Sequence, residues 1–105
     1  MDKDFHLIEL FGLYGNMLTE RQKDLFSLYY ECDLSLGEIA QIKGVSRQSV
    51  NDGLKKSKEV LISTEEKLGL AAKLSALKSI MRACKTGEIS SDDAVSAAVN
   101  ILEEF

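Results

Sequence analysis

LGEIAQIKGVSRQSV, residues 36–50, is the stretch that decides the fold of this chain. A small residue, Ala40, suits the place where two helices cross closely. Gly44, four positions later, permits the positive φ that a tight turn between helices requires. Ser46 follows at the position where a serine caps the start of the next helix. Two short helices joined in this way are a helix-turn-helix, which we expect from about residue 35 to residue 58.

The starts of both helices carry further local signals. Ser35 and Glu38 have the capping-box spacing, in which each side chain bonds to the backbone of the other residue. Each cap also lies between two apolar residues that form a hydrophobic staple: Leu34 with Ile39, and Val45 with Val50. Two stapled caps about ten residues apart fix the directions of two helices and favour a tight helical corner.

The second helix of this motif begins with exposed polar residues. Side chains at the first turn of a recognition helix can contact base edges or hold phosphates, and basic residues one to three turns later can reach the phosphate backbone. The candidate nucleic-acid-binding residues are therefore Ser46, Arg47, Gln48, Ser49, Asn51, Lys55, Lys56 and Lys58. The same pattern is also typical of a helical corner kept for packing, with its lysines merely solvated.

Apolar spacing around this motif predicts helices throughout the chain, and the 105 residues contain no proline. Residues 4–14 form one predicted helix, and Thr19 with Gln22 begins a second. The helix after Ser46 has no strong stop until Gly69, and Ser57 and Thr64 interrupt its apolar face. We therefore expect a single all-α domain over residues 1–105, with C-terminal helices at about 70–105.

Three buried helical faces are predicted from the same spacing. The predicted buried residues are Leu7, Leu10, Phe11 and Tyr14 in the first helix, Leu25, Leu28, Tyr29 and Cys32 in the second, and Leu70, Leu74, Leu77, Met81 and Cys84 in the fifth. The last helix is capped by Ser90 and has an inner face of Ala94, Ala97, Ala98, Ile101 and Leu102.

Charge is unevenly distributed along the chain, whose formal net charge is −4. Residues 35–58 contain five basic and two acidic residues, whereas acidic residues prevail on both sides. The basic excess therefore coincides with the helix-turn-helix, where contacts with phosphates would need it.

Several classes of function receive no support from the residues. The one histidine, His6, is flanked by acidic residues on a helix, and no glycine-rich phosphate loop or nucleophile–base pair is present. Cys32 and Cys84 lack metal-ligand spacing, and we expect both to be buried free thiols. We therefore expect no enzyme, no metal and no cofactor.

The sequence also gives no support for a membrane partner. No apolar run approaches the roughly 18 residues that a membrane-spanning helix needs. The acidic N-terminus, residues 1–4, lacks the basic start and apolar centre of a signal peptide. We therefore expect a cytoplasmic protein without a membrane partner.

Residues 18–61 resemble region 4 of bacterial sigma factors. The resemblance is carried by the stretches LTERQ at 18–22, LSL at 34–36, EIA at 38–40 and GVSR at 44–47. The predicted first helix and the residues after Leu61 do not belong to a sigma factor, and the region that would bind core polymerase is absent. The resemblance implies the fold of residues 18–61 rather than a sigma factor's activity.

Over its whole length the chain more closely resembles the small YlxM-like helix-turn-helix proteins of bacteria. The stretches LFGLYGNMLT at 10–19, YYECDLSL at 29–36 and VSRQSV at 45–50 carry this resemblance. The chain departs from that family at Asn51, where a tyrosine is usual. The resemblance implies an accessory role in the signal recognition particle pathway, with that particle's RNA or its GTPase as partner, and a homodimer.

Three functions stay open: an accessory factor of that particle, which the resemblance implies, a dimeric DNA-binding transcription regulator, or a protein-interaction module. The regulator is favoured by four polar side chains at base-reading positions: Arg47, Gln48, Ser49 and Asn51. The aromatic residues favour an interaction module: Phe5, Phe11, Tyr14, Phe26, Tyr29 and Tyr30. The sequence does not choose between DNA and RNA. A dimer is consistent with the apolar first helix and the stripe at 70–84.

Overall fold

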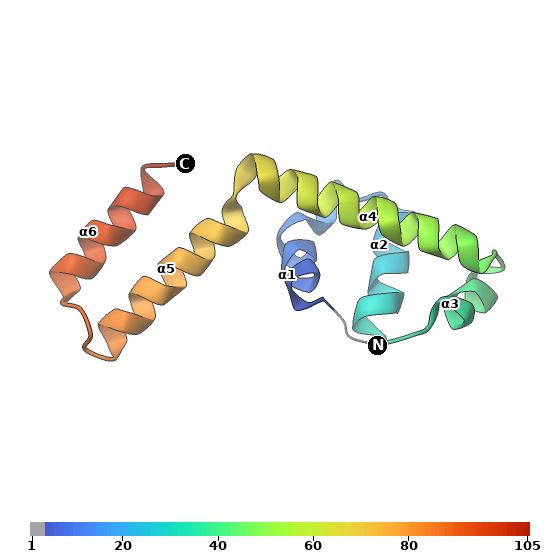
Figure 1. The fold of residues 1–105 in the computed structure, drawn as a ribbon, viewed down its shortest axis with the longest axis horizontal. Coiled ribbons are helices and arrows are strands. Elements are labelled where there is room, and N and C mark those ends of the chain that lie inside the picture. Colours follow the sequence, from blue (N-terminus) through green and yellow to red (C-terminus); the bar gives the residue numbers. More distant parts are fainter. Residues whose placement is uncertain (1–3) are drawn as a thin grey trace. The chain divides into compact units, whose positions relative to one another are not determined.

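The computed structural model describes residues 4–105, so Met1–Lys3 of the acidic N-terminus lie outside the described residues. Within the described part, helices and two short helical turns follow one another and no strand occurs, which confirms the all-α class (Figure 1). The elements are α1 (Phe5–Tyr14), η1 (Gly15–Met17), α2 (Glu20–Phe26), η2 (Ser27–Glu31), α3 (Leu36–Lys43), α4 (Arg47–Leu68), α5 (Leu70–Lys85) and α6 (Ser91–Leu102). They form two compact units, Met1–Leu68 and Gly69–Phe105.

The long helix α4 organises the first unit, because α1, α2 and α3 all pack against it (Figure 1). Its buried face includes Ser57 and Thr64, the two polar residues that interrupt the apolar pattern in the sequence. The Ser57 hydroxyl donates to the Gly53 carbonyl at 2.9 Å, and the Thr64 hydroxyl donates to the Val60 carbonyl at 2.7 Å. Both hydroxyls thus satisfy their hydrogen bonds within α4, so burial leaves neither one unpaired.

Gly53 marks a close approach between α2 and α4 that the sequence pattern does not indicate. A Cβ atom added at this buried glycine would lie 2.5 Å from Cδ1 of Leu25, a fully buried α2 residue. Real Cβ atoms are not found so close to another carbon, so a larger residue here would force the Leu25 side chain to move.

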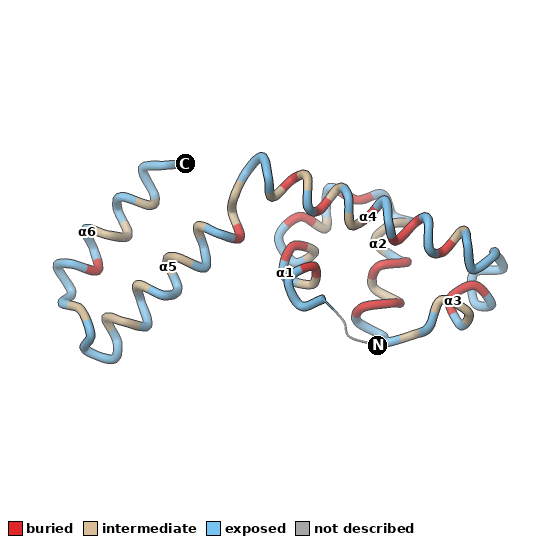
Figure 2. The backbone as a smooth tube through the Cα atoms, viewed as in Figure 1, coloured by how far each residue is buried: buried red, intermediate tan, exposed pale blue. Residues whose placement is uncertain are grey.

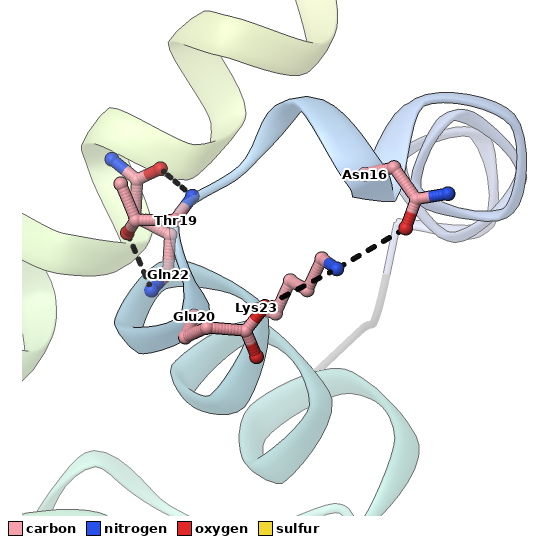
Figure 3. Close-up of polar contacts among 5 residues, drawn as sticks. All are labelled: Asn16, Thr19, Glu20, Gln22 and Lys23. Atoms are coloured by element: carbon pink, nitrogen blue, oxygen red, sulfur yellow. Dashed lines mark hydrogen bonds and ion pairs between the residues drawn. The ribbon is translucent and has the colours of Figure 1, made fainter.

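The expected start of α2 is confirmed. Thr19 accepts from the Gln22 N–H at 3.1 Å, and the Gln22 side chain accepts from the Thr19 N–H at 2.9 Å, which completes a capping box (Figure 3). Lys23 lies beside this turn, where its ammonium donates to Asn16 Oδ1 at 3.1 Å and pairs with Glu20 at 3.6 Å.

The second half of this helix differs from the prediction. Residues Ser27–Glu31 form a wide π turn, in which the Cys32 N–H donates to the Ser27 carbonyl at 3.0 Å. The turn inserts one extra residue into the helix. Phe26 and Tyr30 are buried beside the predicted Leu25 and Tyr29. Phe26 stacks on Phe11 and on Tyr30, with ring centroids 4.5 and 4.3 Å apart.

The expected burial of the two cysteines is also corrected. Cys32 is exposed rather than buried, because the π turn carries it off the inner face of the helix. Cys84 is half-buried on α5, and its Sγ lies 4.0 Å from the Ser91 hydroxyl.

Helix α1 lies as expected, with Asp4 as its N-cap and Leu7, Leu10 and Tyr14 buried. The Tyr14 hydroxyl donates to Glu65 Oε1 at 2.6 Å and links α1 to α4. Phe5, at the start of the helix, is 82% exposed. The aromatic cluster expected from the sequence is therefore mostly core, and Phe5 is its exposed exception.

The second unit is a hairpin of α5 and α6. Gly69, with a φ of 65°, separates α4 from α5, and Ser90 caps α6 through the Asp93 N–H at 3.1 Å. The predicted α5 stripe divides: Leu70, Leu77 and Cys84 are half-buried, whereas Leu74 and Met81 are exposed. Leu102, expected on the inner face of α6, is also exposed. Figure 2 shows how little of this unit is buried compared with α4.

Candidate nucleic-acid interface

The helix-turn-helix is formed by α3, the turn at residues 44–46 and the first half of α4. Gly44 adopts the left-handed conformation, with a φ of 67°, as its place in the sequence predicts. The Val45 N–H donates to the Ala40 carbonyl at 3.0 Å, which closes the end of α3. Ala40 is buried, in keeping with its expected position between packed helices.

Both predicted caps are present in this motif. Ser35 and Glu38 complete a capping box, with the Ser35 N–H donating to Glu38 Oε1 at 3.0 Å. That backbone bond, reinforced by the Ser35 side chain, holds the pKa of Glu38 below its ordinary value. Ser46 accepts from the Ser49 N–H at 3.0 Å and so begins α4. Arg47 and Gln48, the first residues of α4, are exposed.

The outward face of α4 carries three of the predicted residues, Gln48, Asn51 and Lys55, all exposed. They share this face because successive residues of a helix are separated by about 100° of rotation. Asp52 lies among them, and Gln48 Nε2 donates to Asp52 Oδ1 at 2.8 Å. This bond orients the Gln48 amide. The outward face thus includes a carboxylate, although the sequence predicts a basic and polar surface there.

The side of α4 nearest α2 holds a second group. Arg21 of α2 donates from Nη2 to the Ser49 hydroxyl at 2.8 Å, which joins two residues 28 positions apart. A hollow of about 340 Å³ opens beside this bond. Its lining residues are Arg21, Ser46, Gln48, Ser49, Asp52, Gly53 and Lys56. Four of the predicted residues are thus brought together here with one unpredicted cation.

The opposite side of α4 holds the last two predicted residues. The Arg47 guanidinium lies against Gly37 of α3, where an added Cβ would come within 2.7 Å of Nη2. Lys58 extends over the Tyr30 ring, with Nζ 6.0 Å from the ring centroid. Arg47 and Lys58 therefore lie on the flank of α4 opposite the one that faces α2. The eight predicted residues thus divide into an outward face and two flanks.

Sequence reasoning missed Arg21 and the position of Asp52. Arg21 belongs to the capped start of α2, and only the packing of α2 on α4 brings it to Ser49. The positive charge of the helix-turn-helix is also partly neutralised, because Lys43 pairs with Asp24 of α2. The cations that remain around the first half of α4 are Arg21, Arg47, Lys55, Lys56 and Lys58.

Neither a metal site nor a membrane-spanning helix is found in the described part of the chain. Across residues 4–105, no three His, Cys, Asp or Glu side chains are grouped so that they could hold a metal ion. None of the helices in that range combines the length and the apolar character that crossing a membrane requires.

The capped turn, the exposed start of α4 and the cations on its flanks define a helix-turn-helix protein. The family model described as "Putative helix-turn-helix protein, YlxM / p13 like" matches residues 1–101. The chain belongs to this family, also called UPF0122, which confirms the resemblance noted in the sequence.

Curated relatives agree with this assignment. A UPF0122 protein of Shouchella clausii is 38% identical over 105 residues, which span the whole of this chain and 95% of that protein. A UPF0122 protein of Desulforamulus reducens is 53% identical over 74 residues, or 70% of this chain and 63% of that relative. One from Mycoplasma capricolum is 34% identical over 97% of this chain and 90% of the relative.

Proposed function

We propose that the chain binds nucleic acid through the helix-turn-helix, with the start of α4 as its recognition segment. The observation that carries this proposal is the exposed, Ser46-capped first turn of α4, which has a cation-bearing flank on each side. Gln48 and Asn51 lie where a recognition helix presents side chains to base edges. Lys55 and Lys56, one turn further on, are placed to contact backbone phosphates.

The cations on both flanks of α4 favour a duplex or a folded RNA stem as the ligand over an isolated base. Arg21 and Lys56 lie on the α2 flank, whereas Arg47 and Lys58 lie on the other, so phosphates on both sides of a groove can be neutralised. The surrounding chain is acidic and repels phosphate elsewhere, which orients the nucleic acid on this one surface.

A salt titration tests this proposal. Binding of the full chain to a labelled DNA duplex and to an RNA hairpin would be measured by fluorescence anisotropy between low and physiological salt. Lys55→Ala removes one phosphate contact and should reduce the slope of log affinity against log salt by about 0.9 for duplex DNA. Lys67→Ala, at the far end of the same helix, is the matched control and should leave the slope unchanged. Binding to neither ligand, or equal slopes for the two variants, would contradict the proposal.

The biological role that we propose is an accessory, regulatory component of the signal recognition particle pathway, in the cytoplasm. Its support is the resemblance to YlxM-like proteins together with the local basic surface. The chain would touch the particle's RNA, its GTPase protein, or both. Mixing purified chain with each component tests this: no binding to either, and no change in GTP turnover, would exclude the role.

A dimeric DNA-binding transcription regulator is the second candidate, favoured by the outward, exposed Gln48 and Asn51. Two half-sites about one helical turn apart would then be expected. Selection from a random duplex library decides between the candidates. A regulator should yield a motif that is lost with Asn51→Ala, whereas the first role predicts no duplex motif.

A further inference from the structure

Helix α5 is an exception to the acidic surroundings of the helix-turn-helix. It carries four basic residues and no acidic one, although acidic residues prevail over residues 59–105 as a whole. We propose that the outward side of α5 is a second phosphate-contacting surface for nucleic acid. This inference rests on the proposed function for the class of its ligand, but it assigns a contact to a helix outside the helix-turn-helix.

Three of the four cations form one row along α5, which we call the basic stripe. Lys78, Arg82 and Lys85 follow one another at intervals of four and three residues, so they share one side of the helix. All three are exposed. The stripe extends over roughly 10 Å, because each residue of a helix adds about 1.5 Å along its axis.

The fourth cation, Lys73, shows which way the basic stripe faces. Lys73 is half-buried, and its Nζ lies 4.8 Å from the centroid of the Phe105 ring, which follows α6. Cys84, whose Sγ approaches the Ser91 hydroxyl of α6, lies on the same side of α5 as Lys73. Lys78 is turned from Lys73 by about 140° of helical rotation. The basic stripe therefore faces away from α6.

No carboxylate neutralises the basic stripe within residues 4–105. Lys43 of the first unit pairs with Asp24, whereas none of the three stripe cations has an ion-pair partner among the described residues. Within α5, the side chains three and four positions from each stripe cation are apolar, hydroxyl-bearing or basic. Like charges at this spacing repel and destabilise a helix, so an anionic ligand on the stripe would relieve a cost that the chain itself leaves in place.

The helix dipole accounts for only part of the basic stripe. Arg82 and Lys85 lie in the last turn of α5, where the partial negative charge of the helix end favours cations. That effect falls off within the last turn, and Lys78 precedes it. A row of three exposed cations is complementary to a row of anions rather than to a single one.

A nucleic-acid backbone supplies such a row. Each strand of a duplex presents a phosphate about every 3.4 Å along the axis, so a stripe of roughly 10 Å matches several successive phosphates. Ser75 and Ser79 are exposed along one edge of the stripe, where their hydroxyls can donate to phosphate oxygens. Helix α5 contains no Asn, Gln or aromatic residue, so it lacks the amides that read adenine and the rings that stack on bases. Its contact is with the backbone and adds affinity rather than base recognition.

Two double variants with the same net charge test the proposal. Lys78→Gln with Arg82→Gln removes two cations from the basic stripe, whereas Lys67→Gln with Lys73→Gln removes two cations outside it. Glutamine is about as good a helix former as lysine or arginine, and circular dichroism would verify that both variants keep their helix content. Binding of the full chain to a labelled DNA duplex would be measured by fluorescence anisotropy over a range of salt. The stripe variant should reduce the slope of log affinity against log salt by about 1.8, or about 0.9 for each lost phosphate contact, and the control variant should keep the wild-type slope.

Further variants in the same assay separate this proposal from the helix-turn-helix. Lys78→Arg with Arg82→Lys keeps both charges and should keep the wild-type slope. A slope that falls with the stripe variant but not with Lys55→Ala would support the contact on α5 and contradict the one on α4. A slope that falls with Lys55→Ala but not with the stripe variant would overturn the contact on α5 and leave the proposed function standing.

The remaining outcomes concern the ligand of the basic stripe. Equal slopes for the two double variants would show that net charge rather than the stripe governs binding, and would overturn the proposal. Vesicles of an anionic phospholipid serve as a second probe. Vesicle binding that the stripe variant abolishes, with its duplex slope unchanged, would assign the stripe to a lipid surface and overturn the proposal as well.

Discussion

The two units of this chain contain similar helices but differ in how they cover their apolar side chains. In the first unit, the side chains of Leu10, Phe26 and Leu61 are fully buried, and a single long helix, α4, gathers three others around it. In the second, the large apolar side chains are half-buried or exposed. The difference shows that amphipathic spacing predicts a helix and its apolar face, whereas the number of helices packed together decides whether that face becomes a core.

The largest expected effect distinguishes two phenylalanines. Phe26 is fully buried and stacked on Phe11 and Tyr30, so Phe26→Ala should lower the free energy of unfolding by about 3 to 5 kcal/mol. Phe105 is 60% exposed at the end of the second unit, and Phe105→Ala should cost less than about 1 kcal/mol. Urea unfolding followed by circular dichroism measures both. Equal losses would show that the two units are buried to the same degree and would break the comparison.

The next effect concerns the close approach inside the first unit. Gly53→Ala places a Cβ against the fully buried Leu25, and should destabilise the chain by about 1 to 2 kcal/mol despite the better helix propensity of alanine. Gly12→Ala, in α1, is the matched control, because a Cβ there meets nothing within 4 Å. It should stabilise the chain by about 0.5 to 1 kcal/mol. Thermal unfolding of both variants measures the difference, and a Gly53→Ala variant as stable as Gly12→Ala would mean that α2 is free to shift away from α4.

What the sequence predicted correctly has a common physical basis. The capping boxes at Thr19 and Ser35, the cap at Ser46 and the left-handed Gly44 are determined by residues within three or four positions of one another. Their hydrogen bonds depend on local backbone geometry, so residue type and spacing suffice to predict them.

What the sequence did not predict depends on contacts between distant residues or on an irregular backbone. The π turn at Ser27–Glu31 shifts the helical pattern by one residue, which exposes Cys32. Arg21 reaches Ser49 only because α2 packs on α4. The candidate interface was therefore predicted as a segment of α4, whereas its flank on α2 emerges only from the fold.

The smallest expected effect concerns how helices begin in the two units. Helix α3 has a full capping box, whereas at α6 the cap is the Ser90 bond to the Asp93 N–H. Because the Ser35 N–H holds the pKa of Glu38 below its ordinary value, ionised Glu38 favours the folded state. This contribution is fully present above the unfolded-state pKa and is lost as the pH falls through the lowered folded-state pKa. Glu38→Gln keeps a hydrogen-bond acceptor but cannot ionise, so the stability difference between wild type and variant should shrink as the pH is lowered below about 4.5. Urea unfolding at a series of pH values measures this difference, and one that stays constant into acid would show that the capping box does not favour the ionised carboxylate.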